Sequence, residues 1–148
     1  MTDLDTRACP CGSGATLQAC CGRYHTGPEH LAAPTPEALM RSRYTAFVLD
    51  RRDYLLATWA EPHRPAQIEP PEPGLKWLGL TVKGHGLLGP DEGWVEFVAR
   101  CKVGGRAQRI AERSRFVREA GRWLYAAALT GTDTGAGDIS PSRAIKGR

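Results

Sequence analysis

Four of the five cysteines fall within residues 9–22, a stretch that reads CPCGSGATLQACCG. One residue separates the first pair, Cys9 and Cys11, and the second pair, Cys20 and Cys21, is adjacent in the chain. Four thiolates make a closed tetrahedral ligand set for Zn²⁺, which can fold a segment that is too short for its own hydrophobic core. The spacing therefore predicts a structural zinc knuckle, in which Gly12 and Gly14 take the positive φ values of a tight loop.

Other uses of these cysteines remain open at the level of sequence. The chain starts Met-Thr-Asp-Leu-Asp, without a basic start or an apolar run, so we expect it in the cytoplasm, where thiols stay reduced. Adjacent cysteines are also poor disulfide partners, which favours metal over disulfides. Redox-active thiols are the alternative. His25 is a candidate fourth ligand in place of one cysteine, or else a surface histidine just past the knuckle.

These residues carry a resemblance to known families. The cysteine stretch resembles the SEC-C zinc motif, named from the C-terminal tail of the SecA translocation ATPase. Further segments resemble the YchJ family: 25–27, 33–47, 54–55, 58–59, 77–80, 97–100 and 112–116. The resemblance implies Zn²⁺ ligands at Cys9, Cys11, Cys20 and Cys21 and a middle domain of the nuclear-transport-factor-two-like fold.

The chain departs from the pattern of the families that it resembles in two places. Residues 131–148 hold no cysteine, so a second, C-terminal knuckle does not transfer to this protein. The interval 15–19 reads ATLQA and lacks the lysines of the SecA tail, so a contact with the SecB chaperone of the same kind is not expected.

The remaining sequence predicts one α+β domain behind the knuckle. Within 148 residues and a hydrophobic content of 41%, we expect a knuckle over 1–30, a linker over 31–34, a cone-shaped domain over 35–131 and a flexible tail over 132–148. Thr35 and Pro36 are typical of a helix start, and Met40, Tyr44 and Phe47 form its apolar stripe. Asp50 resembles the cap of a second helix that ends before Pro62.

Four strand-like runs follow a proline-rich connection over 61–74. They cover 75–88, 93–103, 107–118 and 122–129, and short glycine-containing turns separate them. Such runs predict an antiparallel meander that curves around the first helix. Alternation places Val95, Phe97, Ala99 and Cys101 on the inner face of the second run, and Trp123, Tyr125 and Ala127 together on one face of the fourth.

Glu112 shares a strand face with Ile110 and Phe116, so we expect a partly buried carboxylate that needs a partner. An arginine of the first helix, Arg41 or Arg43, could form a buried ion pair with it. The alternative is a small-molecule site or enzyme in which Glu112 acts as the base. The further candidates for lining that pocket are Tyr44, Trp59, Trp77 and His85.

Charge and composition guide the expectation about partners. The segment from Arg106 onward contains nine Lys or Arg and four Asp or Glu, and the formal net charge of the whole chain is +4. These charges are either solvated arginines on one sheet face or a binding surface for the ribosome or RNA. Because the four-cysteine ligand set is closed, we expect an interaction module, with a protein as the main candidate partner, more than an enzyme. No window is apolar enough for a membrane, and an exposed sheet face is compatible with a homodimer.

Overall fold

The computed structural model describes residues 7–133 as helices on one side of a curved sheet. The helices are α1 (Gly22–His25), α2 (Pro36–Leu49) and α3 (Arg52–Ala57), followed by a 3₁₀ turn at Glu61–His63. The strands are β1 (Lys76–Gly89), β2 (Glu92–Val103), β3 (Arg106–Glu119) and β4 (Arg122–Asp133). Strand β4 runs to Asp133, and residues 134–148, which make up most of the expected tail, lie outside the described part.

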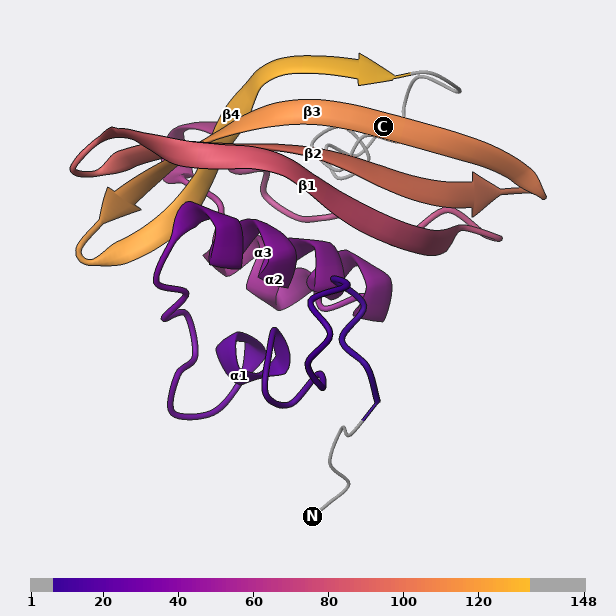
Figure 1. Ribbon diagram of the computed structural model, residues 1–148, viewed down its shortest axis with the longest axis horizontal. Helices are drawn as coiled ribbons and strands as arrows, with labels where there is room; N and C mark the ends of the chain where they lie inside the picture. Colours follow the sequence, from indigo (N-terminus) through magenta and orange to yellow (C-terminus); the bar gives the residue numbers. More distant parts are fainter. Residues whose placement is uncertain (1–6, 134–148) are drawn as a thin grey trace.

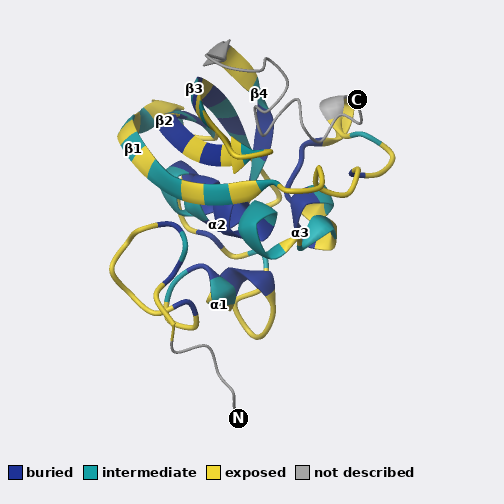
Figure 2. Cartoon of the chain, turned by 90° about the vertical axis from the view of Figure 1, so that its right-hand side faces the viewer, coloured by how far each residue is buried: buried dark blue, intermediate teal, exposed yellow. Residues whose placement is uncertain are grey.

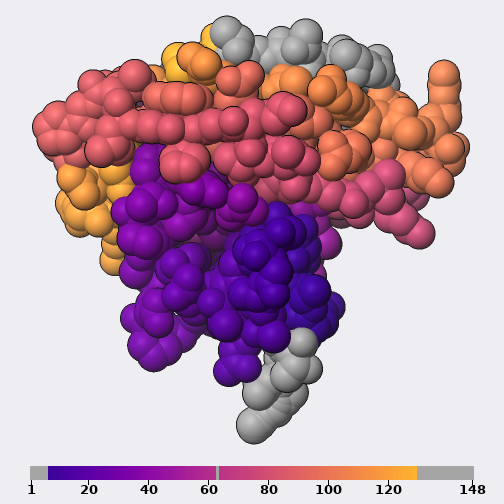
Figure 3. All heavy atoms as spheres, viewed as in Figure 1, coloured from indigo at the N-terminus to yellow at the C-terminus, as the bar shows by residue number. Residues whose placement is uncertain are grey.

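The sheet is an antiparallel meander in the order β1-β2-β3-β4, which confirms the predicted α+β fold. Figure 1 shows the sheet with α2 and α3 beneath it, and the cysteine-containing segment lies against these helices. The tip of that segment reaches β1 (Figure 3), where a Cβ at Gly12 would lie 3.7 Å from the Leu80 carbonyl oxygen. Gly104 and Gly105 link β2 to β3 with φ values of 59° and 80°, a tight turn that only glycine adopts readily. None of the described helices is long and apolar enough to span a bilayer.

The hydrophobic core lies between α2 and the sheet face that covers it (Figure 2). Val95, Phe97, Ala99 and Cys101 of β2 are all buried, as the period-two alternation predicts. On the helix side, Leu39 and Tyr44 are 1% and 2% exposed. The long apolar strands and the apolar stripe of α2 therefore bury each other, which fixes the helix against the sheet.

The boundary between α2 and α3 differs from the expectation. Asp50 has φ 58° and ends α2, with its backbone N–H donating to the Phe47 carbonyl at 3.3 Å. It is therefore a C-cap and not the start of the second helix. The residue before α3 is Arg51, whose side chain makes no capping hydrogen bond. Aspartate is common at helix N-termini and also tolerates the left-handed conformation of a helix C-terminus. Its presence in a sequence therefore does not tell which end of a helix it occupies.

Strand β4 breaks the expected alternation. Its register shifts between the pairs Arg115↔Ala127 and Phe116↔Tyr125, so Ala126 is an extra residue opposite β3. Ala126 is therefore 3% exposed although alternation placed it on the face opposite to that of Tyr125, Ala127 is only half-buried, and Ala128 is exposed as predicted. A β-bulge of this kind leaves no signal in a run of alanines.

The start of α2 offers a simple test of the fold. The Thr35 hydroxyl accepts a hydrogen bond from the Ala38 N–H at 3.0 Å. Replacing Thr35 by alanine is expected to lower the free energy of unfolding by about 1 kcal/mol, measured by urea denaturation. Thr26→Ala, at an exposed threonine outside the helices, is the matched control. An equal loss in both variants would contradict the capping role.

Candidate metal centre

Local hydrogen bonds shape the first half of the knuckle, around Cys9 and Cys11. The backbone N–H of Cys9 donates to the Ala15 carbonyl at 2.9 Å, and that of Gly12 donates to the Cys9 carbonyl at 3.1 Å. Gly12 and Gly14 have φ values of 82° and 94°, which confirms their predicted role in the turn. The loop thus turns both thiols inward without a core of its own.

The second half of the knuckle is built around the Leu17 carbonyl. It accepts from the backbone N–H of Cys20 at 3.1 Å and from that of Gly22 at 2.8 Å. A Cβ at Gly22 would lie 2.8 Å from the same carbonyl oxygen, closer than any side chain can approach. Gly22 begins α1 and is needed for this close approach, which allows the adjacent Cys20 and Cys21 to present both sulfurs to one point.

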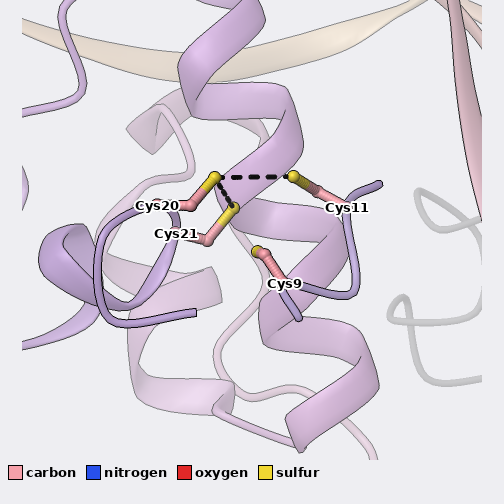
Figure 4. A group of neighbouring side chains, drawn as sticks. All are labelled: Cys9, Cys11, Cys20 and Cys21. Atoms are coloured by element: carbon pink, nitrogen blue, oxygen red, sulfur yellow. Dashed lines mark hydrogen bonds between the residues drawn. The ribbon is translucent and has the colours of Figure 1, made fainter. Parts of the chain in front are cut away.

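Figure 4 shows the four thiols converging in front of α2. Their Sγ atoms all lie within 4.8 Å of one another, with 3.6 Å between Cys11 and Cys20 and 3.9 Å between Cys20 and Cys21. A Zn–S bond of about 2.3 Å puts the sulfur atoms of a tetrahedral site about 3.8 Å apart. The residues present therefore fit a Zn²⁺ ion in both donor type and spacing.

The crowded sulfurs perturb one another strongly. Hydrogen bonds from the thiols of Cys11 and Cys21 lower the pKa of Cys9 far below its usual range. Hydrogen bonds to Cys11 and Cys9 raise the pKa of Cys21, and burial raises that of Cys20. A divalent cation would take the place of the protons that these closely packed thiols share.

The surroundings close the site on the side of the protein. Cys9, Cys11 and Cys21 are at most 4% exposed, and only Cys20 is partly accessible. The hydroxyls of Thr45 and Ser13 lie 3.6 Å from the Cys9 sulfur and 3.1 Å from the Cys20 sulfur. Four sulfurs in such a setting leave no open coordination position for a substrate, the arrangement of a structural zinc site.

Helix α2 holds the knuckle in place. Arg41 donates from Nη1 to the Cys11 carbonyl at 2.9 Å and pairs through Nε with Glu37 at 3.0 Å. The buried cluster that contains the cysteines continues without a break into Leu39, Met40 and Tyr44. Arg41 therefore belongs to the contact between knuckle and helix. The proposed division into a knuckle, a linker and a cone stays a prediction.

His25 has a different place from both of its expected ones. Its side chain is 4% exposed, so it is not a surface histidine. Nε2 lies 2.8 Å from the Ser42 carbonyl oxygen, and Nδ1 lies 3.0 Å from Nη1 of Arg51. A carbonyl only accepts and a guanidinium only donates, so the ring carries its proton on Nε2 and is neutral. Burial lowers the pKa of His25, consistent with this neutral form. Both ring nitrogens are engaged away from the sulfurs.

Glu112 lies at the inner face of the sheet and is 4% exposed. Its Oε2 accepts from the Ser114 hydroxyl at 2.6 Å and from the Tyr125 hydroxyl at 3.3 Å. Arg43 and Tyr44 line the same cavity, whose volume is only about 20 Å³. That volume holds about one water molecule.

The other predicted pocket residues lie outside this cavity. Trp77 packs on Tyr44 with ring centroids 5.6 Å apart, and His85 is half exposed, with Nε2 at 3.0 Å from a Glu37 oxygen. Trp59 packs edge-on against Tyr125 at 5.5 Å, and its indole Nε1 is buried without a hydrogen-bond partner. The roles suggested for these residues in binding or catalysis remain predictions.

Comparison with known families now identifies the chain. The family described as "YchJ, middle NTF2-like domain" matches residues 35–128, and the SEC-C motif matches residues 8–23. This chain belongs to the YchJ family. The matched NTF2-like domain coincides with α2, α3 and most of the sheet, and the SEC-C motif coincides with the knuckle, as the sequence resemblance implied.

Relatives of the family extend over most of the chain. A UPF0225 protein of Methylibium petroleiphilum is 64% identical over 79% of this chain and 84% of its own length. One from Chromobacterium violaceum is 56% identical over 82% and 92%. A crystal structure of a SEC-C motif-containing protein from Psychrobacter arcticus matches with a TM-score of 0.69 at 24% identity, covering 96% of this chain and 93% of that one. This last likeness supports the fold.

The close approach at Gly22 predicts a sharp effect of a small change. Gly22→Ala is expected to displace the Leu17 carbonyl and to destabilise the knuckle by about 1–3 kcal/mol, through overpacking against backbone. Zinc affinity, measured by competition with a chelating dye, should fall in parallel. Gly89→Ala is the control, because a Cβ there meets nothing within 4 Å. Equal affinity of Gly22→Ala and the native chain would contradict this role.

Proposed function

We propose that this protein is a zinc-binding interaction module, in which a structural Zn²⁺ held by Cys9, Cys11, Cys20 and Cys21 shapes a surface for a partner protein. The observation that carries the proposal is the closed set of four mutually close sulfurs seated on α2. The ion would supply folding free energy, of the order of 10 kcal/mol in comparable sites. The same thiols need a reducing compartment, which supports a cytoplasmic location.

The exposed part of the knuckle suits protein contact better than catalysis. Residues 12–16 and 18–19 are exposed, and their side chains are small or uncharged. The alternative, an enzyme or small-molecule site that uses Glu112 as base, has little support, because the cavity beside Glu112 holds about one water. A buried carboxylate that accepts from Ser114 and Tyr125 suits a structural role.

The metal is tested on untagged protein purified without chelator. We expect one zinc per chain and four thiols protected from a thiol reagent, and neither in Cys9→Ser. Reactive cysteines without zinc in the native chain would overturn the proposal and indicate a redox or metal-transfer site.

The class of partner is tested by crosslinking and by salt. We expect the native chain to crosslink to a protein and Cys9→Ser to lose this crosslink. The affinity of the complex should stay the same as salt is raised. Binding that weakens steeply with added salt would instead indicate RNA. The basic residues that could contact RNA include pairs on neighbouring strands, Lys76↔Lys102 and Arg100↔Arg109. Light scattering of the purified chain tests the homodimer.

A further inference from the structure

A second site of a different kind lies where α1, α3 and the loop before β1 meet. A surface cleft of about 790 Å³ opens there, within the size range of ligand pockets. We refer to it as the Arg51 cleft. Its apolar lining includes Tyr54, Leu56 and Ile68, and Thr26 and Gln67 add polar groups. It is separate from the cysteine cluster and from the cavity at Glu112.

Arg51 supplies the chemistry of this cleft. Its backbone N–H donates to the Ala46 carbonyl at 2.8 Å, and its guanidinium donates from Nη1 to Nδ1 of buried His25 at 3.0 Å. Because the neutral imidazole only orients the guanidinium, it does not compensate the positive charge. A guanidinium has five N–H donors, and among residues 7–133 His25 is the one side-chain acceptor that Arg51 contacts.

The neighbouring charges define which anion fits. Arg52 is already paired with Asp50, with Nε and Oδ1 2.9 Å apart, so it adds no net charge. The exposed carboxylate of Asp53 also lines the cleft and repels an anion of high charge. With one half-buried arginine and the Asp53 carboxylate nearby, the cleft suits a ligand with a single negative charge. A planar monocarboxylate fits, because a guanidinium binds it through two parallel hydrogen bonds.

We propose that the Arg51 cleft binds a monocarboxylate group through the guanidinium of Arg51, while Tyr54, Leu56 and Ile68 receive the apolar part of the same ligand. Two sources carry this chemistry: the C-terminal carboxylate of a peptide and a free organic acid. His25 holds the guanidinium of Arg51 through Nδ1, and its Nε2 is anchored on the Ser42 carbonyl of α2. The inference does not depend on the partner of the knuckle being a protein.

The test follows backbone NMR signals of the zinc-loaded full chain during titration. The probes are benzoate, a short apolar peptide with a free C-terminal carboxylate, the same peptide as its amide, and inorganic phosphate. We expect both carboxylates to shift the signals of Arg51, Tyr54 and Ile68 in a saturable way. The affinity of the amide and of phosphate should be lower than that of the carboxylates by a factor of about 10 or more, as expected when a charged hydrogen-bonded contact is lost.

Variants decide whether Arg51 is responsible. Arg51→Gln should weaken carboxylate binding about 10-fold or more. Arg113→Gln, which removes a half-exposed arginine of β3 that does not line the cleft, should stay within about twofold. If Arg51→Gln does not fold, Arg51→Lys keeps the charge without the two-pronged geometry and should bind with intermediate affinity. An absence of saturable shifts, or equal affinity in the native chain and its Arg51 variants, would overturn the proposal.

The same samples distinguish a peptide C-terminus from a free organic acid as the ligand, and they test the cleft separately from the zinc site. Tighter binding of the free-carboxylate peptide than of benzoate assigns the cleft to a protein C-terminus, and the reverse assigns it to a small organic acid. Both support the monocarboxylate site. Zinc content measured on each sample separates this inference from the proposed function, because carboxylate binding that is absent while zinc is bound overturns the cleft alone.

Discussion

Replacing Cys11 by serine is expected to release the metal and to unfold the knuckle while the sheet stays folded. Without the ion, the Arg41 contact and the packing on α2 are not expected to keep the loop folded, so buried Leu17 and Tyr24 become exposed. Returning two such side chains to water lowers stability by about 3–5 kcal/mol. Hydrogen exchange followed by mass spectrometry should show rapid exchange over residues 7–31 in Cys11→Ser and in the chelated native chain, and unchanged protection in β2 and β3.

The fifth cysteine offers the matched control. Cys101 is completely buried in β2, and its thiol lies outside the metal site. Cys101→Ala should therefore keep one zinc per chain and full protection of the knuckle, whatever it costs in core packing. Loss of protection throughout the sheet of Cys11→Ser would show that knuckle and cone form one cooperative unit. Full protection without zinc would show that packing on α2 suffices.

The sequence predicted those features that depend on local chemistry. The structure confirms the glycines at positive φ and the Thr35-Pro36 helix start, and it brings together the four sulfurs that the cysteine spacing assigned to one metal site. The four strands were predictable because glycine turns separate long alternating runs.

Features that depend on tertiary contacts were not predictable in this way. Asp50 is compatible with both ends of a helix, and the bulge at Ala126 has no residue signature. The role of Gly22 depends on how near the Leu17 carbonyl comes, and the Arg51 cleft depends on three segments that meet only in the fold. Arg41 and Arg43 are two residues apart on one helix and yet face the knuckle and the sheet, respectively.

Arg43 carries the second prediction with a large effect. Its side chain is 5% exposed, and Nη1 donates to the Leu55 carbonyl at 2.9 Å and to the Thr58 hydroxyl at 2.7 Å. The guanidinium also lies 4.8 Å from the Tyr125 ring centroid. Burial lowers the pKa of Arg43 to about 10, while Tyr125, Tyr54 and Glu112 favour its charged form. Arg43→Met should lower the free energy of unfolding by about 3–5 kcal/mol, because Glu112 then stays buried without its nearby cation.

A double-mutant cycle with Glu112→Gln tests whether the two charges act together. If they stabilise each other, the double variant should be more stable than the sum of the single effects predicts, by about 1–3 kcal/mol in urea denaturation. Arg52→Met, at a half-exposed ion pair, should change stability by less than about 0.5 kcal/mol. Additive effects would mean that Arg43 acts only through Leu55, Thr58 and the aromatic rings. Glu112 would then depend on Ser114 and Tyr125, and the case for a buried ion pair between helix and sheet would fail.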